Sequence, residues 1–181
     1  MKLLLISSSG RVNSNSECLG KKVLKNLKFD EINLLNYSVD DVLDKREHKI
    51  WQKTSDDYYK IIDLFVKADL VVLSSPIYWY DVSSRLSRFI ERISETLHTD
   101  PDFKAKISHK KVVLVIVGGD APLDKGKVII QRFRYICEFL NLDLVATVIG
   151  CANRSLEAIS DENAMLTAQN VNQKILEMLD N

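Results

Sequence analysis

Residues 3–16 read LLLISSSGRVNSNS, an apolar run followed directly by small polar residues. The first four positions are all aliphatic, which is typical of a β-strand that is covered on both faces of a sheet. The remainder holds five serines, two asparagines, one glycine and one arginine, so it is dense in hydrogen-bond donors. A buried strand that ends in such a loop predicts a ligand-binding site at the carboxyl end of the strand.

The same pattern of a short β-rich run recurs along the chain and alternates with segments of helical period. The predicted strands are 2–7, 30–36, 69–75, 111–118 and 143–150. The predicted helices are 16–27, 55–67, 82–98, 126–140 and 161–180. Repeated strand–helix–strand units imply right-handed crossovers and a parallel sheet sandwiched by helices. We therefore expect a single α/β domain over residues 1–181, with a flavodoxin-like doubly wound five-stranded parallel sheet of order 2-1-3-4-5 and helices on both faces.

Two local features of this pattern are less distinct. Either Ser16 or Asn15 is expected to cap the first helix at its N-terminus. The polar stretch 37–54 predicts a loop or a short helix, and its Trp51 suits either the core or the surface.

Composition excludes several classes of protein. The 181 residues carry 25 Lys plus Arg and 25 Asp plus Glu, so no net charge favours nucleic acid or anionic membrane surfaces. The three cysteines, Cys18, Cys137 and Cys151, lack metal-ligand spacing and predict neither a metal site nor a disulfide framework. The apolar N-terminal run is too short for a signal peptide, and no window approaches the about 20 apolar residues of a membrane span. We expect a soluble cytoplasmic protein.

Three loops are expected to meet at the edge of the sheet where its strands end: residues 7–16, 74–83 and 118–126. The first suits a phosphate group, because hydroxyls, backbone N–H groups and a helix N-terminus converge there. It has neither the Walker A nor the dinucleotide-binding spacing, and a solvated loop with a helix cap is the alternative.

The other two loops suit a flat ring. The second contains PIYWY, whose aromatics fit a conjugated ring system, although packing on helices or on a partner subunit is the alternative. The third begins with Gly118 and Gly119, which allow the backbone to approach a ligand closely.

These loops resemble those of a known family. SSGRVNSNS resembles the GSPRKNGNT type of loop, and SDDYYKIIDLFVKADLVVLSSPIYWYDVSSRLSRFIERI resembles DD…I…ADGIIFGTPVYWGSMSAQLKAFIDR. Both are marks of NAD(P)H-dependent FMN reductases and related flavodoxin-like quinone reductases. The resemblance implies noncovalently bound FMN, with its phosphate on the first loop and its isoalloxazine ring on the other two.

The matching positions are the cofactor-binding residues that the resemblance implies. They are Ser9, Arg11, Asn13, Asn15, Ser16, Pro76, Ile77, Tyr78, Trp79, Gly118, Gly119 and Asp120. Glu91 and Arg92 match an acidic–Arg pair that serves structure or assembly. Ser8 and Tyr80 stand where the family has glycine and Ser87 stands where it has lysine, so Tyr80 is expected to affect the choice of substrate.

The resemblance also implies the activity. Hydride would pass from NAD(P)H to FMN and electrons onward to a small acceptor such as a flavin or quinone, with the chemistry carried by FMN and no catalytic triad. It further implies a homodimer or homotetramer, with a face formed by the ring-loop aromatics and helix 82–98. A flavodoxin-type electron carrier and a non-catalytic flavin-binding protein are the alternatives.

Overall fold

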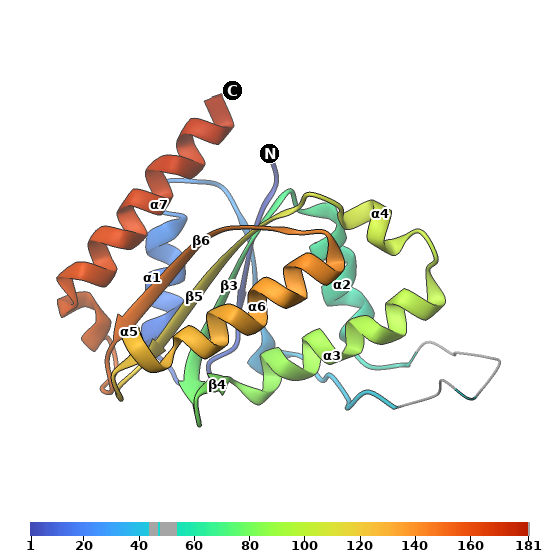
Figure 1. The fold of residues 1–181 in the computed structure, drawn as a ribbon, viewed down its shortest axis with the longest axis horizontal. Coiled ribbons are helices and arrows are strands. Elements are labelled where there is room, and N and C mark those ends of the chain that lie inside the picture. The colour runs from blue at the N-terminus through green and yellow to red at the C-terminus, as the bar shows by residue number, and fades with distance from the viewer. Residues whose placement is uncertain (44–46, 48–53, 181) are drawn as a thin grey trace.

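The chain folds into a twisted sheet with helices on both faces (Figure 1). The computed structural model describes residues 1–43, 47 and 54–180. Within 37–54, the described residues contain neither helix nor strand, and Trp51 lies outside them.

The sheet confirms the predicted topology. Its strands are β1 (Leu3–Ser7), β2 (Asp30–Asn33), β3 (Leu70–Tyr78), β4 (Asp81–Val82), β5 (Lys111–Gly118) and β6 (Asp143–Cys151). The order β2-β1-β3-β5-β6 is parallel throughout, which is the expected 2-1-3-4-5 arrangement of five parallel strands. The short β4, which was not predicted, pairs antiparallel with β3 as a sixth strand.

The five predicted helices are all present. The helices are α1 (Asn15–Val23), α2 (Tyr58–Lys67), α3 (Ser84–Thr99), α4 (Phe103–Ile107), α5 (Pro122–Lys125), α6 (Lys127–Leu140) and α7 (Glu162–Asp180), with 3-10 turns η1 (Leu34–Asn36) and η2 (Glu157–Ser160). The N-cap of α1 is Ser14, so the prediction of Ser16 or Asn15 was wrong by one or two residues. The predicted second strand also ends early, because the Asn33 side chain accepts from the Leu35 N–H and caps η1.

Alternating strand residues build two separate cores. Leu4 and Ile6 face α2, α3 and α6, whereas Leu3 and Leu5 face α1 and α7. Helix α1 approaches the sheet closely at Gly20, where an added Cβ would lie 2.9 Å from the Leu5 side chain. This close contact places the N-terminus of α1 beside the ends of β1 and β3.

A buried ionic cluster ties α3 to the segment that leads into α2. The Arg92 side chain is fully buried and pairs with Asp56 at 2.5 Å and with Glu95 at 2.9 Å. Arg92 also donates to the Asp40 carbonyl at 3.2 Å and to the Thr54 hydroxyl. Arg92 therefore has the structural role that was expected of it.

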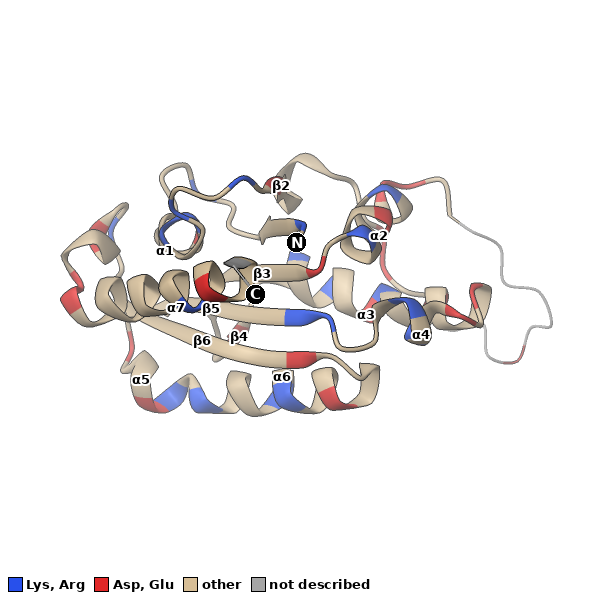
Figure 2. Ribbon diagram, turned by 90° about the horizontal axis from the view of Figure 1, so that it is seen from above, with Lys and Arg blue, Asp and Glu red and all other residues tan. Residues whose placement is uncertain are grey.

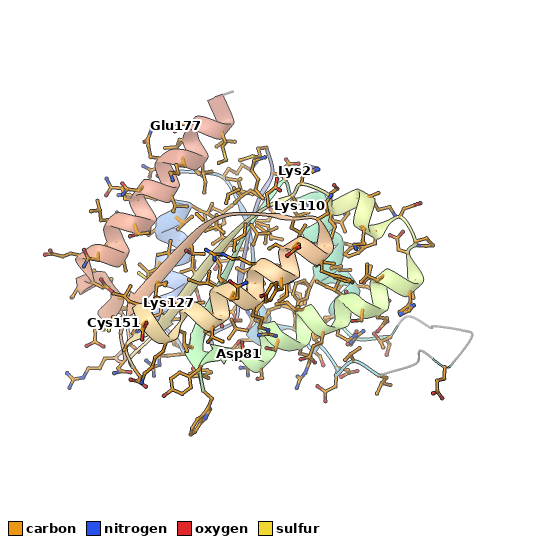
Figure 3. All side chains as sticks on the ribbon, in the orientation of Figure 1. Lys2, Asp81, Lys110, Lys127, Cys151 and Glu177 are labelled. Carbon is orange, nitrogen blue, oxygen red and sulfur yellow. The ribbon has the colours of Figure 1, made fainter. Side chains whose placement is uncertain are left out.

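Charged residues are spread over the outside of the fold. Figure 2 shows Lys and Arg interspersed with Asp and Glu along the helices, while the strands are uncharged except near their ends. Among the side chains labelled in Figure 3, Asp81, Lys127 and Cys151 lie at the edge where the strands end, and Lys2 and Lys110 lie at the opposite edge. The three loops expected to bind a ligand belong to the first of these edges.

Candidate functional site

The β1–α1 loop is held in a fixed shape against β3. Ser8 donates to the Ser74 carbonyl from both its N–H (3.0 Å) and its hydroxyl (3.1 Å). The Ser9 hydroxyl accepts from the Arg11 N–H at 3.2 Å. Ser14 caps α1 by accepting from the Glu17 N–H, and its hydroxyl lies 3.1 Å from that of Ser16. The loop thus presents small hydroxyls next to the free N–H groups of a helix N-terminus.

The Asn15 side chain connects the β1–α1 loop to the loop that follows β6. Its side-chain amide donates to the Arg154 carbonyl at 2.7 Å and accepts from the Ala158 N–H at 3.1 Å. Both ends of the amide therefore hold the β6–α7 loop. The Asn13 carbonyl likewise accepts from the Leu156 N–H.

The loop that follows β6 is a fourth part of the site, which the sequence analysis missed. The Arg11 guanidinium donates to the Asn153 carbonyl at 2.6 Å. The N–H groups of Arg154 and Asn153 donate to Glu157 at 2.7 and 2.6 Å, and these hydrogen bonds lower the pKa of that carboxyl. The fifth parallel strand ends at the same edge as its neighbours, so its position in the predicted sheet was the signal that could have found this loop.

A strained hairpin forms one side of the site. Tyr78 pairs with Asp81, which leaves Trp79 and Tyr80 as a two-residue turn. Both have positive φ, 51° and 63°, as the central residues of a type I′ turn do. This conformation costs about 1–3 kcal/mol for each residue that is not glycine. Trp79 is also 96% exposed, which is unusual for so large an apolar side chain.

The loop between β5 and α5 forms the opposite side. A Cβ added to Gly119 would collide with the Asn153 amide, so a side chain there would displace the Asn153 side chain. The next residue, Asp120, accepts from Lys125 at 2.6 Å and from the Tyr80 hydroxyl at 2.8 Å. The hydrogen bond from Lys125, together with that from Tyr80, holds the pKa of Asp120 below its usual value.

Two adjoining cavities lie between these loops. The smaller, of about 90 Å³, lies at the N-terminus of α1. The larger, of about 230 Å³, lies between the Trp79–Tyr80 turn and the β5–α5 loop. They share Ile77, Gly118, Gly119 and Asn153.

Eleven of the twelve predicted residues line one or both of these cavities. The smaller is lined by Ser9, Arg11, Asn15, Ser16, Pro76, Ile77, Tyr78, Gly118 and Gly119, and the larger adds Trp79 and Asp120. Asn13 lines neither. The lining residues that were not predicted are Ser14, Val117, Ala152 and Asn153 in the smaller cavity and Tyr80, Pro122, Lys125, Gly126 and Asn153 in the larger.

The thiols take no part in this arrangement. Burial, with Glu17 beside it, raises the pKa of Cys18. Burial raises the pKa of Cys137 to about 11.

Among the described residues, no three His, Cys, Asp or Glu side chains are grouped to hold a metal ion. In the same part of the chain, every helix is too short or too polar to cross a bilayer.

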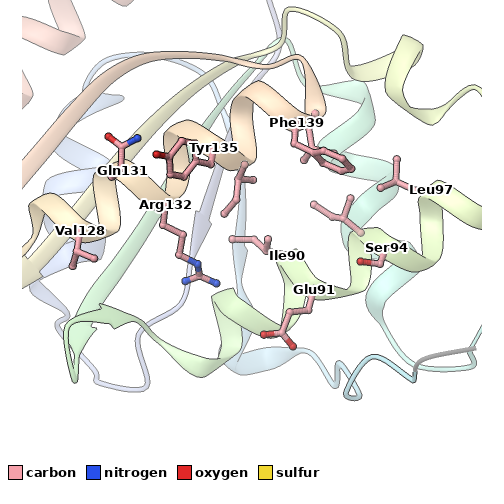
Figure 4. A pocket seen from close by; sticks show the side chains of 12 residues that line it. Ile90, Glu91, Ser94, Leu97, Val128, Gln131, Arg132, Tyr135 and Phe139 are labelled. Atoms are coloured by element: carbon pink, nitrogen blue, oxygen red, sulfur yellow. The ribbon is translucent and has the colours of Figure 1, made fainter. Parts of the chain in front are cut away.

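An apolar groove of about 590 Å³ lies away from this edge, between α3 and α6 (Figure 4). Ile90 and Leu97 line it from α3, and Tyr135 and Phe139 line it from α6. The two aromatic residues are each 63% exposed. At the end of the groove nearer the site, Arg132 pairs with Asp81 of β4.

The chain resembles known proteins over most of its length. The relative YwqN of Bacillus subtilis, named "Putative NAD(P)H-dependent FMN-containing oxidoreductase", is 32% identical over 171 residues, which cover 93% of this chain and 94% of that protein. The solved structure of the Trp repressor binding protein from Bacillus subtilis has 28% identity and a TM-score of 0.79, covering 94% and 99% of the two chains.

More distant structures share the fold. The FMN-dependent NADH-azoreductase from Bacillus anthracis, solved in complex with FMN, is 13% identical, with a TM-score of 0.68 and coverage of 96% of this chain and 98% of that chain.

A family model described as NADPH-dependent FMN reductase matches residues 1–138. This match covers most of the chain and all three predicted loops, and together with the similarity to YwqN it confirms the resemblance: the chain belongs to the NADPH-dependent FMN reductase family.

Proposed function

We propose that residues 1–181 act as a single FMN-binding domain whose two cavities hold the cofactor. The family makes this chain an FMN-dependent oxidoreductase that takes its electrons from NAD(P)H. The finer assignment is that the smaller cavity binds the FMN phosphate and the larger one the isoalloxazine ring. The observation that carries it is the convergence of eleven predicted residues, from three loops far apart in sequence, on two joined cavities.

The smaller cavity fits a phosphate group. Its lining combines Arg11 with the hydroxyls of Ser9 and Ser16 and contains no carboxylate among the described residues. The N-terminus of α1 adds backbone N–H groups and the positive end of the helix dipole. These groups would bind a dianion and fix its position.

The larger cavity fits a flat ring. Gly118 and Gly119 expose backbone to the cavity without a side chain, and Trp79 and Tyr80 supply aromatic surface. When bound, FMN accepts a hydride from NAD(P)H and passes electrons to a second acceptor. The backbone N–H groups of the glycine loop would stabilise negative charge that develops on the ring. We propose a small flavin, quinone or similar molecule as the acceptor.

Titration of the purified protein with FMN, followed by flavin fluorescence, tests the assignment. We expect binding at micromolar concentration or tighter, and Arg11→Ala should weaken it about tenfold by removing a charge-assisted contact. Arg134→Ala, at an exposed position on α6 that lines neither cavity, is the matched control and should bind FMN like the wild type. A wild-type protein that takes up no FMN would refute the assignment.

Turnover separates a reductase from the two alternatives. Oxidation of NADH or NADPH in the presence of a quinone, at a rate that rises with bound FMN, is expected of the enzyme. An electron carrier or a non-catalytic flavin protein would bind FMN without this turnover.

We further propose that two copies associate through the α3–α6 groove. The same face carries an exposed aromatic row on α6 and a hollow beside it, so one surface offers both parts that an isologous contact needs. The proposed dimer face includes α3, which corresponds to the predicted helix 82–98. It does not include the ring-loop aromatics Tyr78, Trp79 and Tyr80, because they do not line the groove.

Light scattering after size exclusion tests the dimer. The wild type should have a mass near twice the 20.7 kDa of the chain, and Phe139→Glu should return it to the monomer. Leu166→Glu, at another exposed apolar residue on α7, is the control and should leave the dimer intact. A monomeric wild type would exclude this interface.

We also propose that the protein works in the cytoplasm. All three cysteines are free, and this suits a reducing compartment. Fractionation of the native cells, with detection in the membrane or secreted fraction, would contradict it.

A further inference from the structure

We propose that Tyr80, Asp120 and Lys125 form a clasp across the larger cavity that selects acceptors by their width. The inference rests on the proposed function, because it concerns access to the same cavity. Tyr80 is also the residue from which the sequence predicts an effect on the choice of substrate.

The clasp joins two separate elements that line the cavity. Tyr80 belongs to the turn between β3 and β4, while Asp120 follows β5 and Lys125 ends α5. The Tyr80 hydroxyl donates to one carboxylate oxygen of Asp120 at 2.8 Å, and Lys125 donates to the same oxygen at 2.6 Å. The Lys125 ammonium also lies 5.4 Å from the centre of the Tyr80 ring. All three residues line the larger cavity.

The turn needs such an anchor. Its two central residues hold a left-handed conformation that favours glycine or asparagine, and Trp79 is almost fully exposed and gains little from packing. Tyr80 reaches the opposite loop through its hydroxyl, which makes it the residue that fixes the turn in place. Loss of this contact is expected to loosen the turn without unfolding the sheet beneath it.

The closed clasp leaves a narrow cavity. Its volume is about 230 Å³, and the side chains of Tyr80 and Lys125 both line it. A bound ring therefore leaves little room for a second wide molecule while Tyr80 bridges to Asp120. Release of the bridge should admit wider acceptors more than it affects narrow ones.

Two variants test the clasp. Tyr80→Phe removes the hydroxyl and keeps the ring, and Asp120→Asn removes the charge that holds Lys125. Asp124→Asn is the matched control, because Asp124 of α5 makes an exposed pair with Lys127 of α6 at 2.8 Å and lines neither cavity.

The first readout needs no cofactor. Amide hydrogen exchange of residues 78–82 in the cofactor-free protein should become at least about tenfold faster in both clasp variants and stay unchanged in the control. Unchanged exchange in the clasp variants would overturn the proposal. This readout remains valid if FMN binding itself fails, so the two failures are distinguishable.

The second readout compares acceptors. The ratio of kcat/KM for a two-ring naphthoquinone to that for a one-ring benzoquinone should rise about fivefold or more in both clasp variants. An unchanged ratio, or an equal loss with both quinones, would overturn the proposal, as would a ratio that rises equally in Asp124→Asn.

Discussion

Replacement of Asp56 by asparagine should destabilise the fold through the buried cluster around Arg92. The Asp56 side chain is 3% exposed and pairs with a guanidinium that is fully buried. Burial raises the pKa of this carboxyl, but hydrogen bonds from Arg92, Thr54 and the Asp40 backbone outweigh burial and lower the pKa to about 2. Asparagine keeps the shape of the side chain and removes its charge.

The lowered pKa gives the magnitude and its dependence on pH. A fall from 3.8 to about 2 corresponds to ~2.5 kcal/mol of stabilisation at neutral pH. Because the folded pKa lies below the unfolded value, this contribution is complete well above pH 4 and is lost as the pH falls through about 2. At pH 3 about half of it remains. For a chain of this length, ~2.5 kcal/mol corresponds to a fall in Tm of about 5–10 °C.

Urea unfolding of the wild type and Asp56→Asn at pH 7 and pH 3 measures the stabilisation by Asp56 and its dependence on pH. The difference in the free energy of unfolding should be about 2–3 kcal/mol at pH 7 and about 1 kcal/mol smaller at pH 3. Asp63→Asn, at an exposed position of the neighbouring helix α2, is the control and should leave the midpoint unchanged. The same difference at both pH values, or a difference below about 1 kcal/mol at pH 7, would refute the reasoning.

Three further outcomes follow from single residues. Ser14→Ala removes the N-cap of α1, so urea unfolding should show a loss of about 0.5–2 kcal/mol in the free energy of unfolding. Titration with FMN should show weaker binding. An unchanged free energy of unfolding would show that the cap does not stabilise the fold. Ser74→Ala should stabilise the fold by about 1 kcal/mol, because the buried Ser74 hydroxyl has no hydrogen-bond partner among the described residues. A loss of stability would show that the hydroxyl does form a hydrogen bond. In thiol titration with a chromogenic disulfide at pH 8, exposed Cys151 should react first and Cys137 should react only on unfolding, and early reaction of Cys137 would contradict its burial.

The strand order was predictable because it depends on patterns that span whole elements. The apolar runs at 2–7, 69–75 and 111–118 became central strands, and in β1 successive residues pack on opposite faces of the sheet. The convergence of the loops then followed from the parallel arrangement, since all five strands end at one edge. Eleven predicted residues reached the two cavities for this reason.

Details that depend on individual hydrogen bonds were not predictable from the same patterns. The β3–β4 hairpin was missed because its turn is Trp79–Tyr80, where a type I′ turn would ordinarily show asparagine and glycine. The amide of Asn15 turns toward the β6–α7 loop, a contact between residues more than 130 positions apart. Asn153 lies in the β6–α7 loop, and only the assembled sheet brings this loop beside Arg11 of the β1–α1 loop.

The two ends of the described chain lie together at the edge of the sheet opposite the cavities (Figure 1). A fluorescent protein or an affinity tag fused at either end would project away from the loops that surround the cavities. For the same reason, attachment to an electrode or a bead through either end would leave the cavities facing the solution. Fusion or surface attachment at either of these ends should therefore leave access to the cavities unchanged.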